Sequence, residues 1–263
     1  LKEAIPYWGR YPIPRRHGNL TMEVPLTDVL RQDFLELFHH LGKLLFLSCV
    51  DSNRRMLNEV DGYLDRHGIR DFKIIQSLDT QLPFEDASLD CLFTFNAIHH
   101  FTLPRFLKET KRVLKNEGRL FIYTRLRSQN RQSIWGQHFP LFHQKETRLY
   151  EFGELKELLR TAKNLELEET EHFRYEREAA LNRLIERARK HHYSTFSLYP
   201  RSEFERCCEE FEKKLRSCFS NLENIRWSDQ NILLVVRKGA KGRLGPRRSG
   251  ADPNLHQHPD PPC

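Results

Sequence analysis

The sequence lacks a long apolar run, since no stretch approaches the roughly 18 uninterrupted apolar residues of a membrane-spanning helix. Its opening, LKEAIPYWGRYPIPRRHG, has no apolar signal core. Because it starts at Leu1 rather than Met, we expect a fragment or a misplaced gene boundary. The six cysteines form no CxxC pair and no regular framework, which argues against a disulfide scaffold or a zinc site. We therefore expect a globular protein of the reducing cytoplasm, without a bound metal.

The sequence also lacks a concentrated block of one charge. The formal net charge is +7, but 30 % of the residues are charged and both signs are interspersed. A surface that follows a nucleic-acid backbone needs its basic residues on one face. A nucleic-acid partner is therefore not expected, although an RNA acceptor stays conceivable without any visible RNA-binding motif.

What the sequence does contain is enough apolar material for a core, with 38 % hydrophobic residues and 18 Phe. From residue 33 to residue 126, helical and strand patterns alternate with short turns between them. This alternation predicts a parallel sheet with helices on both faces. The expected helices are 33–42, 53–68 and 104–118, the last with Gly118 just past its end, and the expected strands are 43–51, 72–76, 89–95 and 119–126.

The second half adds a helix at 154–163, a strand at 165–175, two charged helices and a last strand at 225–238. We expect residues 1–32 to form an irregular or atypical N-terminal segment and 33–238 to form the main domain. The charged helices make a helical insertion at about 176–218. Residues 239–263, rich in Gly, Pro, Arg and His, are expected to be a disordered tail.

Polar residues close each of the buried strand patterns. Asp51, Ser52 and Asn53 follow the first apolar run. Asn96, His99 and His100 follow LDCLFTF. Ligands in an open parallel sheet bind beyond the carboxyl ends of the strands. A carboxylate at such an end can accept two hydrogen bonds from ribose hydroxyls, although Asp51 could equally cap the helix that begins after it.

Three motifs in this order, VDSNRRML, then SLDTQLPFEDASLDCLFTFNAIHHF, then FLKETKRVLKNEGRLFIY, resemble the class I S-adenosylmethionine-dependent methyltransferases of the UbiE-like type 11 group. The resemblance covers roughly Lys43 to Arg125. It implies a Rossmann-like, doubly wound α/β fold with a mostly parallel sheet of about seven strands, an antiparallel last strand and a helical insertion before it. It also implies S-adenosylmethionine as the cofactor and a small-molecule acceptor.

Position by position, the resemblance implies that Asp51 binds the ribose hydroxyls, with Ser52 and Asn53 beside it. The family places an Asp that meets adenine ahead of LPF. Here Leu78 stands at that place and Asp79 follows one residue late. Asn96 matches the position nearest the methyl group and the acceptor.

The family's glycine-rich turn after the first strand is missing. Glycines there let the backbone approach the cofactor closely. Spacing puts this turn near MEVPLTDVL, where Glu23 would be the acid and residues 25–28 would replace the glycines; no glycine occurs between Gly18 and Gly42. Either the cofactor pocket is remodelled, or the segment is a foreign or truncated beginning.

Three further sets of residues are candidates for the acceptor side, each with a plainer alternative. His99 and His100 could act as a base, or could be one packed and one solvated imidazole. Trp135, His138 and Phe139 could line an acceptor pocket, or could clasp the C-terminal helices. His191 and His192 have no ligand-spaced partners, which favours a surface or lid position over a metal site.

Two other functional classes stay open. A catalytically degenerate methyltransferase fold that acts as a binding or scaffold protein would account for the missing glycines. A nicotinamide-dependent oxidoreductase would need G-x-G-x-x-G before Asp51, which is absent, and would leave LPFEDASLD unexplained.

Overall fold

The computed structural model describes residues 18–23, 45–70 and 72–239. Its strands are β1 (Gly18–Glu23), β2 (Leu45–Asp51), β3 (Phe72–Gln76), β4 (Leu89–Phe95), β5 (Leu114–Thr124), β6 (Leu165–Ala179) and β7 (Ile225–Lys238). The helices are α3 (Arg54–Arg66), α4 (Leu103–Val113), α5 (Arg127–Gln132), α6 (Ile134–His138), α7 (Phe142–Lys145), α8 (Phe152–Thr161), α9 (Leu181–Arg189) and α10 (Arg201–Cys218), with short 3-10 helices η1 (Ile98–His100) and η2 (Ser194–Leu198). The helix expected at 33–42 and the tail from residue 240 onward lie outside the described residues.

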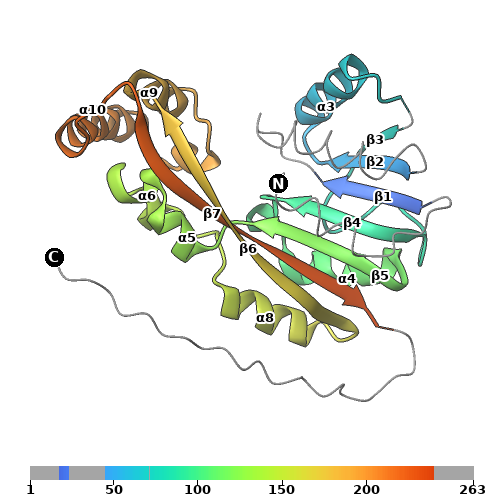
Figure 1. The fold of residues 1–263 in the computed structure, drawn as a ribbon. Coiled ribbons are helices and arrows are strands. Elements are labelled where there is room, and N and C mark those ends of the chain that lie inside the picture. Colours follow the sequence, from blue (N-terminus) through green and yellow to red (C-terminus); the bar gives the residue numbers. More distant parts are fainter. Residues whose placement is uncertain (1–17, 24–44, 71, 240–263) are drawn as a thin grey trace.

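The strands are ordered β3-β2-β1-β4-β5-β7-β6 (Figure 1). The first five are parallel, whereas β7 is antiparallel to both β5 and β6. Helix α3 covers one face of the sheet and helices α4 and α8 cover the other (Figure 1). The predicted α/β fold, with its parallel sheet and antiparallel last strand, is confirmed.

The two strands β6 and β7 continue past the sheet as a ribbon. Strand β7 pairs with β5 only from Ile232 to Arg237, while β6 pairs with β7 along its whole length to Ile225. The ribbon carries helices α9 and α10 at its far end (Figure 1). Because β6 runs to Ala179, the helical insertion begins at Leu181, later than the predicted 176.

Strand β1 lies within the segment that was expected to be irregular. It occupies the middle of the sheet, paired with β2 on one side and β4 on the other. The first strand of the fold is therefore present at Gly18–Glu23, and Glu23 closes it.

The prediction for the end of helix 104–118 was wrong. Helix α4 ends at Val113, β5 begins at Leu114, and Gly118 lies inside the strand. A Cβ on Gly118 would come within 2.9 Å of the Lys115 carbonyl oxygen and 3.1 Å of that of Asp90. The glycine therefore permits a close backbone approach where the pairing of β4 with β5 shifts register.

Three apolar clusters hold these elements together. One lies between the sheet and α3, and a second lies between the sheet and helices α4 and α8. The third joins α6, α7, α9, α10 and η2, with Trp135, Phe139 and Phe211 among its buried residues.

No helix in the described part of the chain is long and apolar enough to cross a membrane.

Candidate functional site

The carboxyl ends of β2, β4 and β5 meet at one edge of the sheet, because these strands are parallel to one another through β1. Asp51 closes β2, Asn96 follows β4 and Arg125 follows β5. Ligands of open α/β sheets bind beyond this edge. We therefore take this edge of the sheet as the candidate site.

Asp51 is held in place through one carboxylate oxygen. Its Oδ1 accepts a hydrogen bond of 2.7 Å from the backbone N–H of Asn53. Burial raises the pKa of Asp51, and the hydrogen bonds from the backbone of Asn53 and Ser52 oppose that change. The cap of α3 is Asn53, whose side chain accepts from the N–H of Arg55 at 2.9 Å. Asp51 is therefore not the capping residue of α3.

The loop after β3 carries Leu78 and Asp79. The Leu78 side chain is 57 % exposed. Asp79 accepts a hydrogen bond of 2.9 Å from the backbone N–H of Thr102, just ahead of α4. The loop is thus tied to the segment that follows β4, with Leu78 left open to a ligand.

Asn96 adopts a left-handed backbone conformation, with φ of 48°. Asparagine tolerates this region better than most residues. Its backbone N–H donates to the Tyr123 carbonyl at 2.7 Å, and its side-chain oxygen accepts from Asn231 Nδ2 at 3.3 Å. Asn96 is therefore positioned by the neighbouring strands β5 and β7.

His99 and His100 lie in η1, with ring centroids 4.0 Å apart. Burial lowers the pKa of His99 to about 4, helped by His100 and opposed by Glu146. Burial and Arg148 also lower the pKa of His100. The Nδ1 atom of His99 is buried and has no hydrogen-bond partner among the described residues. At neutral pH His99 is therefore uncharged.

A buried carboxylate that the sequence analysis missed lies near these histidines. Glu146 is 2 % exposed and accepts hydrogen bonds from Arg148 Nε at 2.9 Å and Thr195 Oγ1 at 2.6 Å. Burial alone would raise its pKa, but the Arg148 and Thr195 hydrogen bonds outweigh burial and the pKa lies below the usual value. Glu146 is thus charged and already satisfied.

Trp135 and Phe139 lie in the third apolar cluster, each 2 % exposed. The Trp135 ring stacks on Phe211 of α10 with centroids 5.2 Å apart, and Phe139 meets Phe196 of η2 at 5.0 Å. His138 contacts Phe219 edge to face at 5.6 Å. Their packing corresponds to the clasp alternative, because neither Trp135 nor Phe139 offers a surface to an acceptor.

An ion-pair cluster beside the strand ends was also missed. Arg125 Nη2 lies 3.3 Å from Asp229 Oδ1, and Arg177 Nε lies 3.9 Å from Asp229 Oδ2. The Arg125 guanidinium lies 5.9 Å from the centre of the Tyr193 ring. The only sequence signal was the polar group SDQN inside an otherwise apolar last strand.

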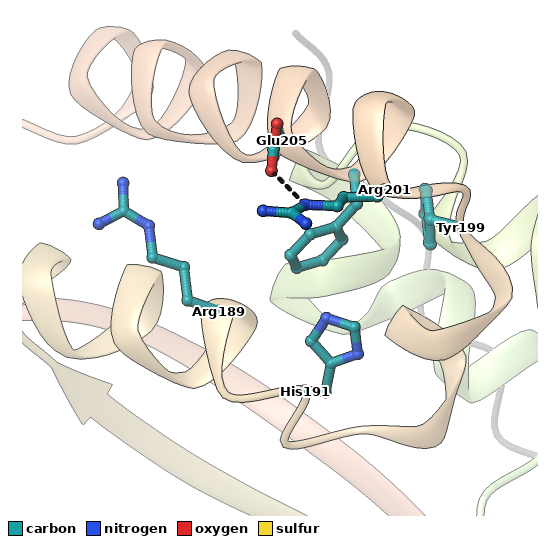
Figure 2. Close-up of a pocket in the computed structure, with 6 residues that line it drawn as sticks. Arg189, His191, Tyr199, Arg201 and Glu205 are labelled. Carbon is teal, nitrogen blue, oxygen red and sulfur yellow. Dashed lines mark hydrogen bonds and ion pairs between the residues drawn. The ribbon is translucent and has the colours of Figure 1, made fainter.

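A separate cavity of about 510 Å³ lies between the ends of α9 and α10. Figure 2 shows Arg201 joined to Glu205 on the α10 side, with His191 on the other side. Its remaining lining residues are Arg189, Tyr199 and Phe204. None of them belongs to the sheet, so this cavity is distinct from the candidate site.

In the described part of the chain no cluster of three or more His, Cys, Asp or Glu could hold a metal.

Comparisons with known proteins agree with this geometry. Residues 33–122 match the methyltransferase domain family Methyltransf_11. A search of curated proteins finds no match. Among solved structures, a putative methyltransferase of Bacillus halodurans shares 14 % identity at a TM-score of 0.60, over 90 % of this chain and 100 % of that one.

Two further structures show the same fold. The YcgJ protein of Bacillus subtilis has 13 % identity and a TM-score of 0.60, over 91 % of this chain and all of the other. Geranyl diphosphate C-methyltransferase from Streptomyces coelicolor, solved with geranyl diphosphate and S-adenosyl-L-homocysteine, has 11 % identity and a TM-score of 0.53, over 90 % of this chain and 79 % of that one. At these identities the likeness concerns the fold alone.

Proposed function

We propose that the protein transfers a methyl group from S-adenosylmethionine to a small-molecule acceptor, a proposal supported by the match of residues 33–122 to a methyltransferase domain family. The observation that carries this proposal is Asp51. The backbone N–H of Asn53 fixes its carboxylate at 2.7 Å, at the strand end where a ribose would lie. A fixed carboxylate oxygen is a good acceptor for a sugar hydroxyl.

The residues around Asp51 fit the rest of an adenosyl group. Leu78 offers an exposed apolar side chain on the adjacent loop. Asn96, fixed at the end of β4 by β5 and β7, faces the reaction centre in this proposal. Residues 25–28, which stand where the family has glycines, lie outside the described residues.

The chemistry needs little from the protein beyond positioning. S-adenosylmethionine supplies an electrophilic methyl group on a sulfonium. The protein brings the acceptor to the strand ends and excludes water there, and holding two reactants at near-attack distance can supply a large part of the rate. Burial lowers the pKa of His99 to about 4, which makes its imidazole a weak base at neutral pH, so the proposal assigns the rate to positioning rather than to proton removal by His99. The five described cysteines are free thiols, which supports the proposal of a cytoplasmic protein.

Isothermal titration of the folded protein with S-adenosylmethionine and S-adenosylhomocysteine tests the proposal. We expect both to bind, and we expect Asp51→Ala to weaken binding by about tenfold or more, because a charge-assisted hydrogen bond is lost. Asp61→Asn, at an exposed position of α3, is the matched control and should bind as the wild type does. No heat from either ligand with folded wild-type protein would favour the degenerate, non-catalytic alternative.

A further inference from the structure

The ribbon formed by β6 and β7 overhangs the candidate site. Thr124, the last residue of β5, pairs with Ile232, so the part of β7 before Ile232 continues past the carboxyl end of β5. In that part Tyr175 lies opposite Asp229 and Arg177 lies opposite Trp227. Opposite residues of an antiparallel pair lie on the same face. Phe173 of β6 lies on the same face and belongs to the apolar cluster between the sheet and α3.

Two guanidinium groups share a single carboxylate on this face. Asp229 is only 8 % exposed and lies between Arg125 and Arg177, at 3.3 and 3.9 Å. The Arg125 side chain is 12 % exposed, while that of Arg177 is 36 % exposed at the outer side of the cluster. Glu146, the buried acid beside His99, is already bound by Arg148 and Thr195. Among the described residues Asp229 is the one carboxylate within 4.0 Å of either guanidinium, so this partly buried cluster has one positive charge in excess there.

Aromatic rings flank both arginines. Arg177 lies 5.1 Å from the centre of the Tyr175 ring and Arg125 lies 5.9 Å from that of Tyr193. The indole Nε1 of Trp227 is buried and has no acceptor among the described residues. A partly buried cation bordered by rings and by an unsatisfied N–H is complementary to an acceptor-rich anion on a planar molecule.

We propose that Arg125 and Arg177 bind an anionic group, a carboxylate or a phosphate, on a planar or aromatic methyl acceptor. This inference rests on the proposed function, because it assigns the acceptor to the edge where the methyl group would be presented. Arg177 makes the contact from the open side, and Asp229 holds Arg125 in place behind it. In this proposal Arg125 and Arg177 contact the acceptor and not the cofactor.

Titration of the full chain with benzoate, phenyl phosphate and benzamide tests this inference. We expect one or both anions to bind at least about tenfold more tightly than the neutral amide, and the tighter of the two identifies the group. Arg177→Gln should abolish that preference. Arg174→Gln, on the opposite and exposed face of β6 and paired with Glu176 at 3.2 Å, should keep it.

The inference is overturned if neither anion binds, if the amide binds equally well, or if the preference survives in Arg177→Gln. The titrations are made without cofactor, so their outcome does not depend on S-adenosylmethionine binding. A parallel titration of Arg177→Gln with S-adenosylhomocysteine should match the wild type. Failure of that ligand with every form of the protein would count against the proposed function and leave the anion result standing.

Discussion

Arg125 and Asp229 form an ion pair across the end of β5, with the guanidinium 3.3 Å from the carboxylate and both side chains nearly buried. Removing one partner of a buried pair leaves the other charge without compensation. We expect Asp229→Ala to lower the free energy of unfolding by about 3–5 kcal/mol. Urea denaturation measures this. Glu176→Gln, which breaks the exposed pair with Arg174, should change stability by less than about 0.5 kcal/mol.

A second prediction concerns His99 and the dependence of stability on pH. Its pKa in the folded protein, about 4, lies below the ordinary 6.5, so the unfolded chain binds more protons between these values. Stability should therefore fall as the pH drops from 6.5 toward 4, by about 3 kcal/mol from this group, because one pKa unit corresponds to about 1.4 kcal/mol. His100 acts in the same direction.

Urea denaturation at a series of pH values checks this second prediction. His99→Gln should flatten the curve between pH 6.5 and 4.5. Glu146, whose pKa is lowered, loses its stabilising contribution only at lower pH, so it does not mask the effect there. His172→Gln, at an exposed position of β6, serves as the control and should leave the slope unchanged. An unchanged slope in His99→Gln would contradict the buried, uncharged imidazole.

A third prediction distinguishes the two roles considered for Phe139, which are packing that holds the C-terminal helices and lining of an acceptor pocket. Phe139 is buried among Phe196, Tyr199 and Phe211. Phe139→Ala should cost about 3–5 kcal/mol of stability through lost burial and a residual cavity. The remaining folded protein should bind S-adenosylhomocysteine and the anionic probes as the wild type does. Unchanged stability together with lost probe binding would instead place Phe139 in the acceptor pocket.

A fourth prediction compares two glycines. At Gly118 a Cβ would meet backbone oxygens at 2.9 and 3.1 Å, whereas at Gly153 of α8 nothing lies within 4 Å. Gly118→Ala should destabilise the protein by about 1–3 kcal/mol because backbone atoms must move. Gly153→Ala should be neutral or stabilise by up to about 1 kcal/mol, since alanine is the better helix former. Thermal unfolding distinguishes the two, and equal effects would contradict the close approach at Gly118.

Sequence patterns predicted the strands best where they are buried on both faces. LDCLFTF is mostly apolar, and β4 is buried along almost its whole length. The strand GNLTME was missed because its polar residues interrupt any such run and no glycine-rich turn follows it. The end of α4 was misplaced because LKNEG suits a helix end as well as the start of a strand with an irregular register.

The candidate site was predictable only where it lies next to a strand end in sequence. Asp51 and Asn96 could be assigned in this way, because each directly closes an apolar run. The pair of Arg125 and Asp229 could not, since it depends on β7 returning antiparallel to β5 and overhanging the edge. The same applies to Glu146, whose partner Thr195 lies 49 residues away.

The most direct test of the account is a crystal structure of the protein with S-adenosylhomocysteine in excess. The account predicts density for the ligand at the carboxyl end of β2, with a ribose hydroxyl at hydrogen-bond distance, about 2.7 Å, from the Asp51 carboxylate. An empty strand edge under saturating ligand, or a ligand bound away from Asp51, would contradict it.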